Sequence, residues 1–129
     1  MNSLEHAKHN ERVCNFLGRN PDFGDWVITT AFYAAMHYVR HLMVPVTIEG
    51  TTYRDFENLF LARKSMMEGR HGFMKSYVVV NFPEIGLDYC RLHDMSTTAR
   101  YTNYMYTREQ ANTSKVYLEN IRKYVAQRK

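Results

Sequence analysis

The sequence contains little cysteine: Cys14 and Cys90 are the only two, and they form no Cys-x-x-Cys pair. The first residues also lack the basic stretch followed by an apolar stretch that marks a secretory signal. Because structural disulfides belong to oxidising compartments, these absences argue against a secreted, disulfide-rich protein. We expect a reduced protein in the cytoplasm.

Motifs of the common nucleotide-binding and hydrolytic enzymes are missing as well. There is no P-loop, no G-x-G-x-x-G and no H-E-x-x-H, and no Ser-His-Asp order can be read along the chain. The sequence therefore gives no support for a nucleotide-binding α/β fold or for a serine hydrolase, and no cofactor is expected.

A long apolar run free of charged residues is also absent. Residues 26–44 are fairly apolar, but they contain His37, Arg40 and His41, so we interpret them as a buried core helix and not a membrane span. No internal repeat, low-complexity tract or linker is visible. We therefore expect one domain over residues 1–129, with no membrane partner.

Helical periodicity is what the sequence does have, since apolar residues recur at spacings of three and four. Helices are predicted over residues 3–17, from Asp22 or Asp25 to about residue 44, over 56–69, from Pro83 to about Ala99, and over 107–128. Residues 46–50 are predicted to be a loop or a short extended piece. The run 78–80, three valines, favours a strand locally, but a lone strand would have no partner. We therefore predict a helix over residues 71–81 and an all-α fold, an up-and-down bundle of four to five helices.

Two of these helices are predicted with a particular buried face. The last helix has a capping box, Thr107 followed three residues later by Gln110, and a clear apolar face. That face comprises Ser114, Tyr117, Leu118, Ile121, Tyr124 and Val125. In the helix over 56–69, Met66 and Met67 are expected to share the buried face of Phe56.

The charge balance and the tyrosines point weakly to an acidic partner. Seventeen basic and thirteen acidic residues give a net charge of +4, without a basic arm, and there are ten tyrosines. Tyrosine suits stacking surfaces because it buries a ring and keeps a hydroxyl for hydrogen bonding. The stretch 99–106 concentrates Arg100, Tyr101, Tyr104 and Tyr106. An RNA or nucleotide partner is compatible with this composition.

Four polar side chains are expected on one side of the helix that begins at Pro83. At 100° per residue, Tyr89, His93, Ser96 and Arg100 fall within about 60° of one another. They are either a boundary strip of hydrogen bonds or an anion-binding strip in which the Arg100 guanidinium meets phosphate or carboxylate.

Histidines give two further hypotheses. His37 and His41 lie four residues apart, so they share a helix face and form a candidate metal pair. Two ligands are not a site, and Tyr33, one turn earlier, favours a hydrogen-bonded core histidine. Arg70 and His71 lie near a predicted helix start, where an imidazole beside arginines can act as acid or base on a phosphodiester.

Several segments resemble the HEPN family, small helical domains found in higher eukaryotes and prokaryotes. The likeness lies in residues 25–39, which resemble the second helix of single-domain members, in Gly69-Arg70-His71, and in 89–101, which resemble a Tyr-x-x-Leu, Ser, Ala-Arg-Tyr pattern. The resemblance implies a homodimer that is either a metal-independent ribonuclease, often of toxin or defence systems, or a binding module for RNA, nucleotides or a protein partner.

The sequence departs from the family at the catalytic motif, an arginine followed after four to six residues by a histidine. Counted from Arg100, the histidine positions are Met105, Tyr106 and Thr107, and Arg63 lies one residue too far from His71. The first hypothesis is therefore a binding module using Arg100, Tyr101, Tyr106, Ser96, Tyr89 and Arg70. The second is a ribonuclease using Arg100 with His71 or His93, and the third is a metal-binding bundle using His37 and His41.

Overall fold

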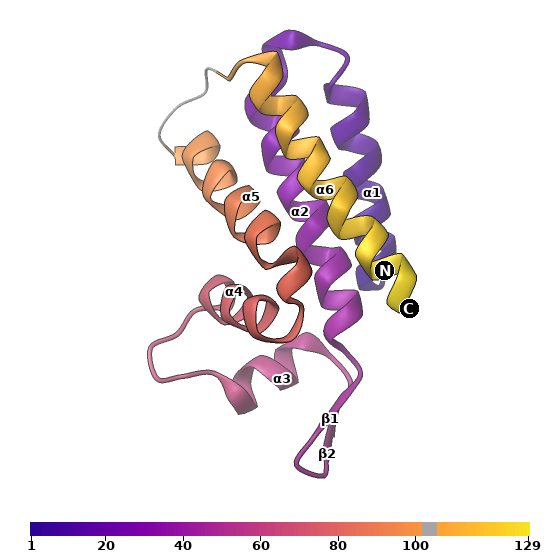
Figure 1. The fold of residues 1–129 in the computed structure, drawn as a ribbon, viewed down its shortest axis with the longest axis vertical. Coiled ribbons are helices and arrows are strands. Elements are labelled where there is room, and N and C mark those ends of the chain that lie inside the picture. Colours follow the sequence, from indigo (N-terminus) through magenta and orange to yellow (C-terminus); the bar gives the residue numbers. More distant parts are fainter. Residues whose placement is uncertain (102–105) are drawn as a thin grey trace.

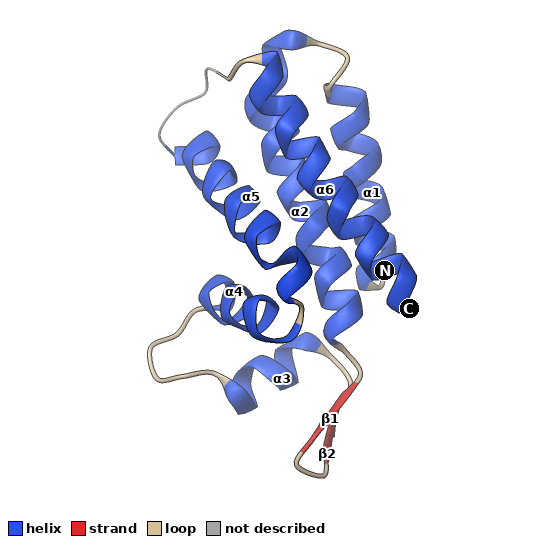
Figure 2. Cartoon of the chain, viewed as in Figure 1, coloured by secondary structure: helices blue, strands red, loops and turns tan. Residues whose placement is uncertain are grey.

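Four long helices form the body of the protein, and they run alternately up and down (Figure 1). The computed structural model describes residues 1–101 and 106–129. The long helices are α1 (Ser3–Leu17), α2 (Gly24–Met43), α5 (Pro83–Tyr101) and α6 (Arg108–Arg128). The shorter α3 (Phe56–Arg63) and α4 (Arg70–Asn81) lie together at one end, beside the hairpin of β1 (Val46–Ile48) and β2 (Thr51–Tyr53). The described chain is mostly helical (Figure 2), as the sequence predicts, but it has six α-helices where four to five were expected.

Helix α2 is the centre of the bundle because it packs against α1, α5 and α6. Thirteen of its residues are buried, so the prediction of a core helix over residues 26–44 is confirmed. Among the described residues, no helix combines the length and apolarity needed to cross a membrane.

The predicted caps are right for α6 and wrong for α2. The Thr107 side chain accepts a hydrogen bond from the backbone N–H of Gln110, and the Gln110 side chain accepts one from the backbone N–H of Thr107, which is the predicted capping box. Neither Asp22 nor Asp25 caps α2, whose N-cap is Phe23 without a side-chain hydrogen bond. The reason is a 3-10 turn, Pro21–Phe23, that enters α2 and is itself capped by the Asn20 side chain.

The chain between α2 and α4 differs most from the prediction. Helix α3 ends at Arg63, because Lys64 adopts an extended conformation, and the helix does not continue to residue 69. Met66 and Met67 are therefore 91% and 93% exposed, and the prediction that they share the buried face of Phe56 is wrong. The hairpin agrees with the short extended piece predicted near residues 46–50. Its turn residues Glu49 and Gly50 both have positive φ, which suits the tight connection of two twisted strands.

The ambiguous segment 71–81 is a helix, α4, as predicted. Phe73, Met74 and Val78 of α4 are buried against the rest of the core. Val79 and Val80 stay 51% and 76% exposed, so the valine run supplies one core contact and not a strand. Pro83 begins α5 one residue after α4 ends, as expected for proline in a first helical turn.

Candidate functional site

Helices α4 and α5 bring two histidines together on α2. The ring centroids of His71 and His93 are 5.0 Å apart, with 44° between the ring planes. Both rings rest on Phe32, at centroid distances of 5.7 Å for His71 and 5.1 Å for His93. Since Phe32 is fully buried in the core, its ring packs beneath both imidazoles and holds them in place.

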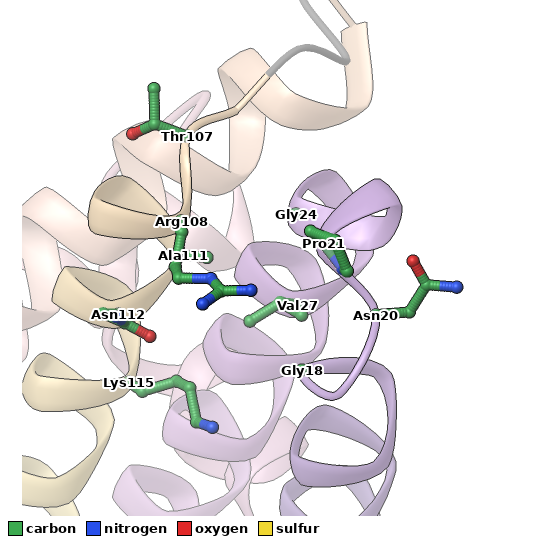
Figure 3. Close-up of a pocket in the computed structure, with 10 residues that line it drawn as sticks. All are labelled: Gly18, Asn20, Pro21, Gly24, Val27, Thr107, Arg108, Ala111, Asn112 and Lys115. Carbon is green, nitrogen blue, oxygen red and sulfur yellow. The ribbon is translucent and has the colours of Figure 1, made fainter.

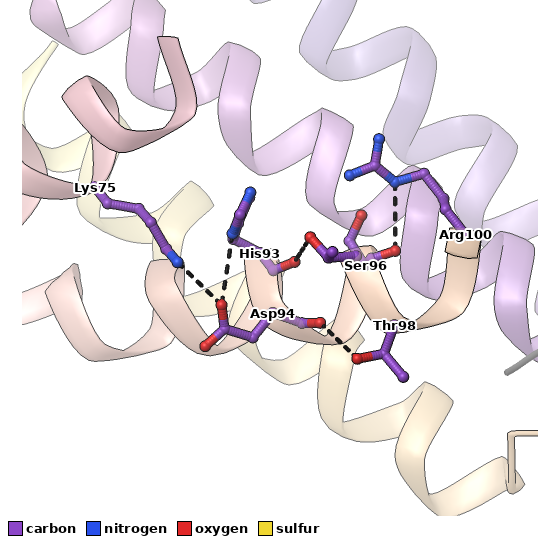
Figure 4. Close-up of polar contacts among 7 residues, drawn as sticks. Lys75, His93, Asp94, Ser96, Thr98 and Arg100 are labelled. Atoms are coloured by element: carbon purple, nitrogen blue, oxygen red, sulfur yellow. Dashed lines mark hydrogen bonds and ion pairs between the residues drawn. The ribbon is translucent and has the colours of Figure 1, made fainter. Parts of the chain in front are cut away.

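Arg100 extends the group along α5, two turns after His93. Its Nη1 donates a hydrogen bond to the Tyr33 hydroxyl at 3.1 Å, and its Nε donates to the Ser96 carbonyl at 3.3 Å. Figure 4 shows the side chains of His93 and Arg100 extending to the same side of α5. We call His71, His93 and Arg100 the His–Arg cluster.

Two polar atoms in and beside the His–Arg cluster, Nδ1 of His71 and Oγ of Ser96, are shielded from water and have no hydrogen-bond partner among the described residues. Nδ1 of His93 is shielded as well, and it lies 3.5 Å from Asp94 Oδ1, at the outer limit of a hydrogen bond. Buried polar atoms in folded proteins are nearly always paired, so the unpaired atoms of His71 and Ser96 are unusual. They make this region a candidate site for a ligand that would supply the missing partners.

Both imidazoles are held neutral near pH 7. Burial lowers the pKa of His71, and the nearby His93 and Arg100 lower that pKa further. Burial also lowers the pKa of His93, and Lys75 adds to the effect. A neutral imidazole can accept a proton or donate one hydrogen bond, while Arg100 supplies the permanent positive charge.

Lys75 and Asp94 form the outer edge of the site, and neither was among the residues predicted for it. Lys75 Nζ lies 3.0 Å from Asp94 Oδ1, and His93 Nδ1 lies 3.5 Å from the same oxygen, a pair drawn in Figure 4. Hydrogen bonding from Lys75 lowers the pKa of Asp94, which therefore stays ionised. The spacing of four residues between His71 and Lys75 on one helix could have revealed the lysine.

The other residues predicted for the ligand strip do not all join the cluster. Tyr89 is fully buried, and its hydroxyl lies 3.6 Å from Met74 Sδ, so Tyr89 belongs to the core. Arg70 does not join the His–Arg cluster, because its guanidinium pairs with both carboxylate oxygens of Glu57 on α3.

The two described tyrosines of the stretch 99–106 lie near Arg100 in different ways. Tyr101 is 74% exposed, and its ring centre lies 5.1 Å from the Arg100 guanidinium carbon. The Tyr106 hydroxyl lies 3.5 Å from the Met95 carbonyl oxygen. A side chain at position 24 would approach Tyr106 Cβ to 3.1 Å, so Gly24 permits this packing. Tyr104 and Met105 lie outside the described residues.

His37 of the candidate metal pair does not bond Tyr33, although the sequence favoured that hydrogen bond. His37 stacks on His6 with ring centroids 4.8 Å apart, and Tyr33 bonds Arg100 instead of His37. The described part of the chain contains no group of three or more histidine, cysteine, aspartate or glutamate side chains placed to hold a metal ion.

Several hollows lie away from the His–Arg cluster, and two of them differ greatly in size. The smaller lies between the start of α6 and the connection from α1 to α2 and is lined by Arg108, Lys115 and Val27 among others (Figure 3). Its volume of about 30 Å³ is that of one water molecule, so it cannot hold a nucleotide. The larger is an open groove of about 620 Å³ near the end of α2.

No family model, curated protein or solved structure matches this chain. The assignment of the candidate site therefore rests on the geometry of its residues alone.

Proposed function

We propose that the protein is a HEPN-like binding module, a cytoplasmic homodimer that binds a phosphate group of RNA or of a nucleotide at the His–Arg cluster. The observation that carries this proposal is the convergence of His71, His93 and Arg100 on Phe32 and Tyr33. A role in a toxin or defence system follows from the family resemblance alone.

The chemistry of the cluster suits a phosphate ester. A guanidinium fork is planar and carries a permanent charge, so it recognises phosphate oxygens strongly. Tyr33 orients the guanidinium of Arg100, and the neutral imidazoles can each donate a further hydrogen bond. The exposed ring of Tyr101 beside Arg100 offers a surface on which a base can stack.

Binding is favoured over cleavage because the catalytic spacing of the family is absent. Tyr106 and Thr107 occupy two of the positions where the family has a histidine. A tyrosine, with a pKa near 10, is a poor general base at neutral pH, and burial raises the pKa of Tyr106 further.

Arg100→Ala should weaken binding of a fluorescein-labelled single-stranded RNA by about 10- to 100-fold. A hydrogen bond to a charged group contributes about 1.5–3 kcal/mol, which corresponds to this range. Fluorescence anisotropy in EDTA measures the affinity. The dependence of affinity on salt should also fall, by a slope of about 0.7 for one lost phosphate contact.

The matched control is Arg91→Ala, because Arg91 is exposed on the same helix and makes no ion pair among the described side chains. Equal losses in both variants would reduce the effect to net charge and reject the site. A parent protein that binds no RNA or nucleotide even at low salt would instead favour a protein partner.

The proposed homodimer has its own test. Sedimentation of the parent protein should give about twice the chain mass of 15.3 kDa.

A metal-independent ribonuclease is the second candidate, because two imidazoles lie 5.0 Å apart beside an arginine. One neutral imidazole can take the proton of the 2′-hydroxyl, a protonated one can donate to the leaving oxygen, and Arg100 can stabilise the phosphorane charge. Both pKa values are lowered, so few molecules hold a protonated imidazole at pH 7. Any such activity should peak below about pH 6.5, the unperturbed histidine value.

An RNA cleavage assay in EDTA at pH 5.5 and pH 7.5 separates the two candidates. The binding proposal expects no cleavage by the parent protein at either pH. Cleavage that is strongest at pH 5.5 and disappears in His71→Ala, His93→Ala and Arg100→Ala would establish the ribonuclease. Activity retained in all three variants would indicate a contaminating nuclease.

A further inference from the structure

A groove with a basic lining lies at the C-terminal end of α2, and the proposed function does not use it. This groove, of about 620 Å³, is formed by the start of α1, the end of α2 and the segment that joins β2 to α3. His6, His37, Arg40, His41 and Arg54 line it, whereas no member of the His–Arg cluster does. We call it the α2-end groove.

Two imidazoles are stacked in the wall of the α2-end groove. His6 from α1 and His37 from α2 have ring centroids 4.8 Å apart and ring planes only 20° apart. Nδ1 of His37 is shielded from water and has no hydrogen-bond partner among the described atoms. A ligand in the groove would therefore reach His37 at Nε2. Burial, with Arg40 and His6 nearby, lowers the pKa of His37 to about 4, so this ring is neutral at pH 7.

Arg40 is held rigidly at the same wall. Its guanidinium carbon lies 4.1 Å from the centre of the Phe56 ring, and its Nε donates to Met74 Sδ at 3.5 Å. A guanidinium fixed in this way loses little freedom when an anion binds. No carboxylate within the described residues forms an ion pair with Arg40 or with Arg54.

The acidic side chains of the groove have other partners. Glu57 is bonded by the guanidinium of Arg70, and Asp55 accepts hydrogen bonds from the amide and the side chain of Asn58 at the start of α3. Lys129 Nζ donates to the carbonyls of His41 and Val44. Arg40 and Arg54 therefore keep guanidinium groups free of ion pairs among the described residues, in a groove that the carboxylates of Asp55 and Glu57 also line.

We propose that the α2-end groove is a binding site for the phosphate group of a small phosphorylated compound. Its donors come from three directions: His6 from α1, His37 and Arg40 from α2, and Arg54 from the segment before α3. A tetrahedral phosphate offers oxygens in several directions at once, while a planar carboxylate satisfies one guanidinium fork. The site is independent of the His–Arg cluster.

Nuclear magnetic resonance of the histidine ring protons tests the site directly with inorganic phosphate as the probe. At pH 7.5 and constant ionic strength, phosphate should shift the His6 and His37 signals along a saturating curve. Acetate should bind at least tenfold more weakly. A linear, non-saturating change, or equal affinity for acetate and phosphate, would overturn the proposal.

Two variants make the test specific. Arg54→Gln should weaken phosphate binding at least fivefold without disturbing the core, because Arg54 is exposed. Arg40→Gln should weaken binding at least tenfold, with its melting curve recorded alongside. Arg100→Gln should leave the His6 and His37 shifts unchanged, so failure of the His–Arg cluster and failure of this groove give different results. Unchanged phosphate affinity in Arg54→Gln would reject the site even if Arg40→Gln does not fold.

Discussion

Phe32→Ala should lower the free energy of unfolding by about 3–5 kcal/mol, the range observed when a fully buried phenylalanine is truncated. Phe32 has no exposed surface, and its ring lies 5.9 Å from those of Tyr33 and Tyr89, centre to centre. The variant leaves a cavity beneath His71 and His93, which rest on this ring. Urea unfolding measures the loss.

The same substitution should bring the pKa values of His71 and His93 closer to that of an exposed histidine. Burial is the first cause of the lowered pKa of His71 and of His93, so removing the ring beneath them should raise both values toward 6.5. Titration of the ring protons checks this. Phe16→Ala is the matched control, because Phe16 is 67% exposed and should change stability by about 0.5 kcal/mol or less. A Phe32 variant as stable as this control would contradict the assigned packing.

Ile121→Ala should cost about 2–4 kcal/mol, because the side chain is fully buried in the face that α6 presents to the bundle. The expectation comes first from the period of apolar residues along α6. The structure confirms burial for every residue of that face except Tyr117, which is half-buried. Thermal unfolding of the variant gives the value.

Val116→Ala on the same helix is the control for Ile121→Ala, since Val116 is 56% exposed. It removes methyl groups from the same element with little change in buried area, so its effect should stay near zero. Comparable melting temperatures for the two variants would mean that α6 does not pack as described.

Local sequence predicts the helices well where the apolar period is long. The face of α6 and its Thr107–Gln110 cap need only spacing and capping chemistry, and the helical state of residues 71–81 needs only the absence of a partner strand. The prediction fails at Met66 and Met67, where the chain leaves the helix after Arg63. Their spacing fits a helix face, but spacing says nothing about where the backbone stops being helical.

Only part of the candidate site could be predicted from the sequence. The wheel of α5 places His93, Ser96 and Arg100 on one side, which the structure bears out. The meeting of His71 with His93, and of Tyr33 with Arg100 across 67 residues of chain, depends on how α4 and α5 dock on α2. No pattern within one helix contains that information. The assignment of Tyr33 to His37 failed for the same reason, since the tyrosine found a partner on another helix.

The spacing of residues along α2 sets how two bound anions would affect each other. Tyr33 and Arg40 lie seven residues apart on this helix, which is roughly 10 Å along its axis at 1.5 Å per residue. The screening length in physiological salt is about 8 Å, so charges at the two positions repel only weakly there. In about 0.01 M salt that length grows to about 30 Å, and occupancy of one position would then disfavour the other. On the proposal that both positions bind anions, their occupancies should be nearly independent in physiological salt and antagonistic in dilute buffer.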